Sequence, residues 1–205
     1  MKVDTLRRLA QARPQVPEAV ERCDLCGEPL PAEHRHLLDV ASGQPQCACR
    51  ACAILFDRGQ AGGDHYRLIP ERRICLPPLA GEERLWAALG IPVDLAFITC
   101  GANGVIARYP SPLGLTTAAP APDAWAQVVA ANPVLGDLEP DVEALLVNRA
   151  RGARERWIVP LDDCFRLAAR LREHWRGFHG GDAVWEAIAR FFAELHARRD
   201  PKEAP

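Results

Sequence analysis

Two closely spaced groups of cysteines constrain the fold of this chain more than any other feature. Five of the eight cysteines fall in residues 23–52, as Cys23-x-x-Cys26 followed by Cys47-x-Cys49-x-x-Cys52. A Cys-x-x-Cys turn places two sulfurs on one side of a tight loop, and two such loops that face each other form a tetrahedral thiolate cage. The spacing therefore predicts a metal site made by Cys23, Cys26, Cys49 and Cys52, with strands in the 22 residues between the pairs.

Zinc is the metal that this stretch favours. Gly27 follows the first pair, where a metal knuckle often needs a positive φ. The second pair carries Arg50 and two alanines where a rubredoxin-type iron site usually has a proline and a glycine, and Phe56 is its one aromatic residue. Mononuclear iron stays open as the alternative metal. Cys47, a fifth thiol, stays open as a replacement for Cys49 or as part of an iron–sulfur cluster.

Disulfides and free thiols are the alternatives to a metal, but clustered thiolates repel each other unless a cation or a bond compensates them. The N-terminal residues lack the apolar core and cleavage site of a secretory signal, so we expect a reducing cytoplasm, which favours metal ligation. His34 and His36 are ligands by residue type. Because four cysteines complete a tetrahedral site, we expect both histidines at the surface of the hairpin.

The composition is that of an ordinary globular chain. Its 205 residues are 48% hydrophobic with a net charge of −2, and no apolar run approaches the roughly 18 residues of a membrane span. A dedicated nucleic-acid binder normally carries a basic excess, which this chain lacks. One or two domains are expected at this length.

Hydrophobic periodicity and turn residues predict an α+β fold. The predicted helices cover residues 3–12, 82–90, 122–133, 162–178 and 182–199, with Gly90 ending the second and Asp123 capping the third. The predicted strands cover 37–41, 49–56, 65–70, 72–76, 93–99, 105–110, 142–150 and 155–160.

These elements divide the chain into two parts. Residues 1–76 are predicted to hold an N-terminal helix and a zinc ribbon with rubredoxin-like knuckles. Residues 79–199 are predicted to form an antiparallel sheet with the C-terminal helices packed on one face. Residues 200–205 are expected to be a disordered tail.

No recognised catalytic motif is present, so we expect no enzyme and name no catalytic residue. Cys164 follows Asp162 and Asp163, but these carboxylates suit the start of a helix, where they cap free amides. Cys75 and Cys100 are expected to be packed thiols.

Four arginines are predicted around one hairpin tip: Arg149, Arg151, Arg154 and Arg156. Such a group is a candidate patch for a phosphate or an acidic partner, and its alternative is a solvated turn.

Stretches through most of the chain carry a resemblance to a known family: CDLCGEPLPAEHRHLLD, CACRACAILF, YRLIPER, LGIPVDLAF, VIARYPSPLG, VVAANPVLGDLEPDVEALLVNR, VPLDDCFRL and WRGFHGGDAVWEAIARFF. They resemble a bacterial family of unknown function encoded beside nickel–iron hydrogenase genes. The resemblance implies an accessory role in making, assembling or wiring a hydrogenase. It carries over no active-site residue.

Three functions follow as hypotheses. The first is a non-catalytic zinc-ribbon accessory protein that binds a nickel–iron hydrogenase subunit or a maturation factor. The second is a rubredoxin-like iron electron carrier associated with a hydrogenase. The third is a zinc-ribbon regulator that binds nucleic acid, which would show steep salt dependence.

Overall fold

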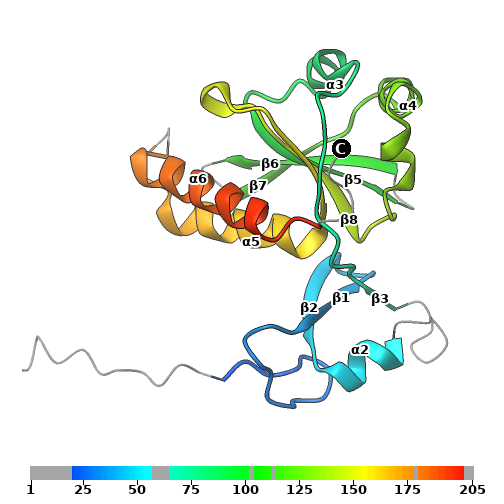
Figure 1. The fold of residues 1–205 in the computed structure, drawn as a ribbon, viewed down its shortest axis with the longest axis vertical. Helices are drawn as coiled ribbons and strands as arrows, with labels where there is room; N and C mark the ends of the chain where they lie inside the picture. The colour runs from blue at the N-terminus through cyan, green and yellow to red at the C-terminus, as the bar shows by residue number, and fades with distance from the viewer. Residues whose placement is uncertain (1–19, 57–64, 102–103, 112–113, 178–179, 201–205) are drawn as a thin grey trace, which may run out of the picture.

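The structure is a computed structural model of the chain, and it describes residues 20–56, 65–101, 104–111, 114–177 and 180–200. The predicted helix over residues 3–12 lies outside these ranges, as do residues 201–205 of the expected tail. The described chain forms a small cysteine-bearing part and a larger sheet with helices on both faces (Figure 1).

The larger sheet is antiparallel throughout, with the strand order β4-β9-β8-β5-β6-β7. Its strands are β4 (Ile74–Cys75), β5 (Leu95–Gly101), β6 (Gly104–Ser111), β7 (Gly114–Ala118), β8 (Glu143–Asn148) and β9 (Glu155–Pro160). Every residue of β8 is buried. Its central residues, 144–147, are all apolar, because helices cover the sheet above and below.

Helices α5 (Leu161–His174) and α6 (Asp182–Ala197) cover one face, as the sequence predicted. Helices α3 (Glu82–Leu89) and α4 (Pro122–Ala131) cover the other (Figure 1). Short 3-10 helices lie at Pro133–Asp137 and Ala150–Gly152 in the same domain. The C-terminal helices on one face are therefore confirmed, and a second helical layer is added.

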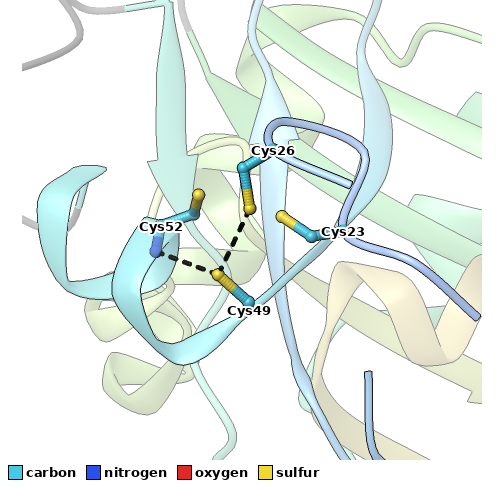
Figure 2. Close-up of side chains that lie close together, drawn as sticks. All are labelled: Cys23, Cys26, Cys49 and Cys52. Carbon is cyan, nitrogen blue, oxygen red and sulfur yellow. Dashed lines mark hydrogen bonds between the residues drawn. The ribbon is translucent and has the colours of Figure 1, made fainter. Parts of the chain in front are cut away.

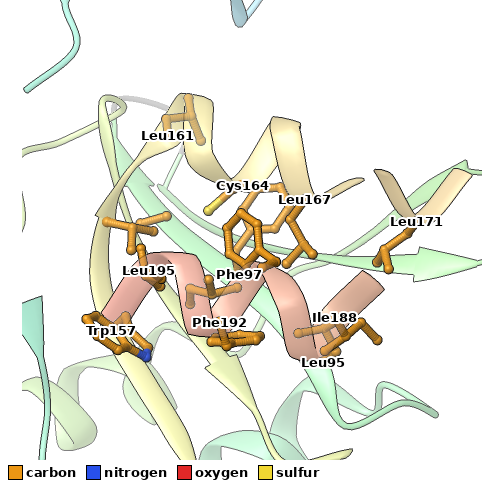
Figure 3. Packing of buried hydrophobic residues seen from close by; sticks show 14 of the residues in the cluster. Leu95, Phe97, Trp157, Leu161, Cys164, Leu167, Leu171, Ile188, Phe192 and Leu195 are labelled. Carbon is orange, nitrogen blue, oxygen red and sulfur yellow. The ribbon is translucent and has the colours of Figure 1, made fainter. Parts of the chain in front are cut away.

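Successive residues of the central strands feed two separate cores. In β5, Leu95 and Phe97 pack with α5 and α6, whereas Ala96 and Ile98 pack with α3 and α4. This follows from the two-residue repeat of a strand, which points neighbouring side chains to opposite faces. Figure 3 shows the first core, where Trp157 of β9 lies among leucines and phenylalanines of the sheet and both helices.

The N-terminal part, residues 20–56 and 65–69, is called the cysteine unit here. Its sheet has the order β2-β1-β3, with β1 (Arg35–Asp39), β2 (Gln44–Ala48) and β3 (Tyr66–Leu68). The predicted strand over residues 49–56 is wrong, because Arg50–Phe56 forms helix α2. Its first turn is closed by a bond from the Ala53 amide to the Cys49 carbonyl. Alanine and leucine favour this helix, and so short an apolar run does not distinguish helix from strand.

The cysteine unit packs against the sheet domain, residues 70–200. Leu38 of β1 and Ile69 belong to the same core as α5 and α6. β4, which the sequence analysis placed with the metal-binding part, pairs with β9 in the larger sheet. The Leu76 amide extends this pairing with a bond to the Arg156 carbonyl. Residues 74–76 are thus structurally part of the sheet domain.

Candidate metal centre

The first cysteine pair lies in a tight loop ahead of β1. The Gly27 amide donates to the Cys23 carbonyl at 2.8 Å, and Gly27 has a φ of 78°. The positive φ predicted for this glycine is therefore confirmed. The loop brings the Cys23 and Cys26 side chains to the same side, with Cys23 buried and Cys26 exposed.

The second pair lies at the start of α2. Cys49 directly precedes the helix, Cys52 lies in its first turn, and the Cys52 amide donates to the Cys49 sulfur at 3.4 Å. Amides at a helix start have no partner within the helix and can stabilise a thiolate. Figure 2 shows the loop with Cys23 and Cys26 facing this helix start.

The four sulfurs have the separations that a tetrahedral metal requires. All four lie within 4.8 Å of one another, and the Cys26 and Cys49 sulfurs are 3.7 Å apart. Metal–sulfur bonds of about 2.3 Å give a tetrahedral cage sulfur–sulfur edges of about 3.8 Å. The cysteine set therefore fits a four-thiolate metal ion.

The four neighbouring thiols have different pKa values, because each thiolate affects the ionisation of the others. Burial raises the pKa of Cys23, but the amides of Cys49, Cys26 and Leu25 stabilise its thiolate and lower the pKa to about 6. Burial, followed by the neighbouring thiols Cys26 and Cys49, raises the pKa of Cys52. One thiolate thus opposes the ionisation of the next unless a cation compensates them.

Cys47 does not join this set. It groups instead with His34 and His36, and burial followed by the charges of Asp24 and Glu21 raises its pKa to about 11. The expected surface position of the histidines is also wrong for His34, whose side chain is only 7% exposed. The order of residues does not reveal this group, because it depends on the pairing of β1 with β2.

The remaining cysteines are thiols of the sheet domain. Cys164 is fully buried, and burial followed by the charges of Asp163 and Asp162 raises its pKa. Burial also raises the pKa values of Cys75 and Cys100, which are partly exposed. A protonated, enclosed thiol is a poor nucleophile, so Cys164 has the properties of a core residue.

Asp162 and Asp163 have partners far away in sequence. The N-cap residue of α5 is Pro160, which provides no side-chain capping bond. Asp162 Oδ2 lies 2.9 Å from His36 Nδ1, and Asp163 Oδ2 accepts a 2.6 Å bond from Arg73 Nε. Both carboxylates lie in the first turn of α5, as expected, and Asp162 Oδ1 accepts the Asp163 amide at 3.0 Å. They also join His36 of the cysteine unit and Arg73, which precedes β4, to α5.

Three of the four arginines of the predicted patch have carboxylate or aromatic partners within the protein. Arg156 forms a two-bond pair with buried Glu82, and Arg149 pairs with Glu83 while lying over the Trp86 ring. Arg151 lies 4.4 Å from the Trp185 ring centroid, and Arg154 is exposed. The structure therefore does not gather the four guanidinium groups around one anion site.

The described residues form an α+β protein whose N-terminal unit carries four close cysteines compatible with a metal site. The chain belongs to the family described as a family of unknown function, DUF5947, which matches residues 22–199. The match runs through the cysteine unit and the sheet domain. Neither the comparison with curated proteins nor that with solved structures gives a match. None of the helices in the described ranges has both the length and the apolar character of a membrane span.

Proposed function

We propose that this chain is a non-catalytic accessory protein with a structural zinc ion held by Cys23, Cys26, Cys49 and Cys52. The observation that carries the proposal is the mutual approach of four sulfurs, all within 4.8 Å, in a unit that has little other core. The zinc would fix the loop, the hairpin and α2 relative to one another.

The small core of the cysteine unit favours a structural role for the metal. Its buried cluster consists of Cys23, Leu30, Leu37, Ala48, Cys52 and Ala53. Two of these six residues are proposed ligands. Units this small usually need a metal or disulfides to fold, and zinc binding contributes folding free energy directly, about 10–16 kcal/mol in zinc-finger peptides.

Exposed apolar side chains support a protein-binding role. Among the described residues, the large hydrophobic side chains that are exposed are Val20, Val40, Ile54 and Leu55, and all four lie in the cysteine unit. Ile54 and Leu55 are neighbours on α2 and are 65% and 54% exposed. By contrast, the apolar faces of α5 and α6 pack against the sheet. We therefore assign the partner surface to α2.

The partner we propose is a nickel–iron hydrogenase subunit or a maturation factor, the association that the sequence resemblance implies. The test uses the tagged full chain, produced in cells that make such a hydrogenase, and identifies the proteins that co-purify. We expect a hydrogenase subunit or maturation factor with the wild-type chain and its loss with Ile54→Ser/Leu55→Ser.

Gln127→Ser, at an exposed residue of α4 in the sheet domain, serves as the control and should retain the partner. Zinc content verifies that the double variant keeps its fold. Recovery of no hydrogenase component with the wild-type chain would contradict the proposed association, and equal recovery with the double variant would contradict the α2 surface.

A rubredoxin-like iron carrier is the second candidate, and the position of Cys26 favours it. This ligand is exposed, so a metal in the cage would lie close to the molecular surface, where an electron could enter. The amide bonds to the Cys23 and Cys49 sulfurs are of the kind that adjusts the potential of iron–thiolate sites. Metal analysis with an absorption spectrum separates the two candidates.

A further inference from the structure

Three more metal-binding side chains meet on the hairpin of the cysteine unit. His34 directly precedes β1, His36 lies in β1, and Cys47 of β2 is paired directly with His36. Residues two apart on a strand share a face, and paired residues of adjacent strands are close neighbours. One ring nitrogen of each histidine and the Cys47 sulfur lie within 4.8 Å of one another.

Hydrogen bonds at Nδ1 orient both imidazole rings. His34 Nδ1 lies 3.0 Å from the Pro31 carbonyl oxygen, which can only accept, so Nδ1 carries the proton. His36 Nδ1 lies 2.9 Å from Asp162 Oδ2. A carbonyl or carboxylate on Nδ1 is the usual support of a histidine that binds metal through Nε2. Both rings therefore have their Nε2 atoms available as ligands.

The Nε2 atom of His34 is the strongest sign of a missing partner. It is buried and has no hydrogen-bond partner among the described residues, in a side chain that is only 7% exposed. A buried polar atom without a partner destabilises the folded state. A cation bound at this nitrogen would remove that unfavourable contribution to the free energy of folding.

Acidic side chains surround the group and favour a cation. Each of the three residues has a carboxylate nearby: Glu21 Oε2 lies 3.9 Å from His34 Nδ1, Asp162 contacts His36, and Asp24 accepts the Cys47 amide at 2.6 Å. A carboxylate therefore lies beside each of the three residues, where it would attract a bound cation.

We propose that His34, His36 and Cys47 bind a second zinc ion, distinct from the structural zinc of the four cysteines. Two imidazoles and a thiolate suit zinc, and three protein ligands leave a fourth position for water or an incoming group. His34 and His36 line a cleft of about 810 Å³ between the hairpin and α5, with Arg73, Asp162 and Arg166 also in its wall. This cleft gives the fourth ligand a route of entry.

Zinc content of the full-length protein tests the second site. The protein is loaded with zinc, desalted and analysed, and we expect two zinc ions per wild-type chain and one in His34→Gln/His36→Gln. His65→Gln, at an exposed histidine of the same unit, is the matched control and should keep two. Cys47→Ser, a smaller change, should also leave one and replaces the double variant if that variant does not fold.

Cys26→Ser distinguishes the two sites, because it removes a ligand of the four-cysteine cage only. Zinc-loaded and desalted Cys26→Ser should retain one zinc ion per chain, and Cys26→Ser/Cys47→Ser should retain none. A wild-type chain with one zinc that the histidine variants retain would overturn the second site while leaving the structural zinc in place. One zinc lost only in the histidine variants would support the second site and contradict the first.

Discussion

At the residue scale, Cys26 allows the clearest test of the four-cysteine cage, because its side chain is exposed. Replacing it with serine removes a thiolate ligand without opening a cavity in the core. We expect Cys26→Ser to lose one zinc ion per chain, since tetrahedral structural sites require all four ligands. Elemental analysis measures the loss.

Cys75→Ser is the matched control for this variant, because Cys75 lies in β4, outside the cysteine unit. It should bind as much zinc as the wild-type chain. Unchanged zinc content in Cys26→Ser would rule out Cys26 as a ligand.

Cys164 should behave as a structural thiol. Burial and two neighbouring carboxylates raise its pKa, so it stays protonated and inaccessible in the native chain. We expect no alkylation of Cys164 by iodoacetamide at pH 8 and full alkylation after denaturation, measured by peptide mass mapping. Partly exposed Cys100 serves as the internal comparison. Native labelling of Cys164 faster than Cys100 would reopen a nucleophilic role.

The sequence predicts residues whose roles are local and misses those whose partners are distant. Gly27 was predicted to have a positive φ because the geometry of its loop depends on adjacent residues. Asp163 was expected to cap a helix, since its local context is a helix start, yet it bonds to Arg73, 90 positions away. Such pairs depend on how the elements pack, and residue order alone does not determine that packing.

At the element scale, Asp163 of α5 pairs with arginines at the start of β4 and at the end of α6, namely Arg73 just before β4 and Arg198 just after α6. The Asp163 side chain is 2% exposed and lies 2.6 Å from Arg73, 2.7 Å from Arg166 and 3.5 Å from Arg198. We expect Asp163→Ala to lower the free energy of unfolding by about 3 kcal/mol, because removing one member of a buried ion pair leaves its partners uncompensated. Urea denaturation measures the change.

Asp182→Ala is the control for this prediction, since Asp182 also lies at a helix start but its side chain is 95% exposed. A solvated carboxylate contributes little, so the control should unfold at nearly the wild-type urea concentration. Equal effects of the two substitutions would contradict the structural role of Asp163.

Helices whose ends are marked by glycine or proline were predictable from the sequence. Gly90 ends α3 with a φ of 60°, as its position after the apolar stripe predicts. The helix over 122–133 is confirmed as α4, but its N-cap is Ala121 rather than Asp123. The error at α2 has a different cause: the same alanines and leucine suit a strand or a helix, and the requirement to bring Cys52 beside Cys49 decides between them.

At the scale of the whole molecule, metal removal should affect the two parts differently. All five tryptophans lie after residue 79, in the sheet domain. A strong chelator should therefore unfold the cysteine unit and make it protease-sensitive while tryptophan fluorescence stays native. Simultaneous loss of both signals would mean that the two parts unfold as one cooperative body.

The architecture was predictable where the spacing of apolar residues repeats over a whole strand or helix. Alternating apolar residues and two amphipathic C-terminal helices gave the antiparallel sheet with helices on one face, and both are confirmed. The helical layer of α3 and α4 on the opposite face was not predicted. Both helices had been recognised, but the side on which they pack follows from the direction of long connections, which has no local sequence signal.

The central claim is that the four cysteines hold a structural zinc ion. The most direct test is elemental analysis with a visible absorption spectrum, on full-length protein purified without oxygen and without added metal. We predict bound zinc, no iron and no visible absorption band. Iron with thiolate charge-transfer bands would contradict the claim and favour electron transfer, and a chain without bound metal would contradict both.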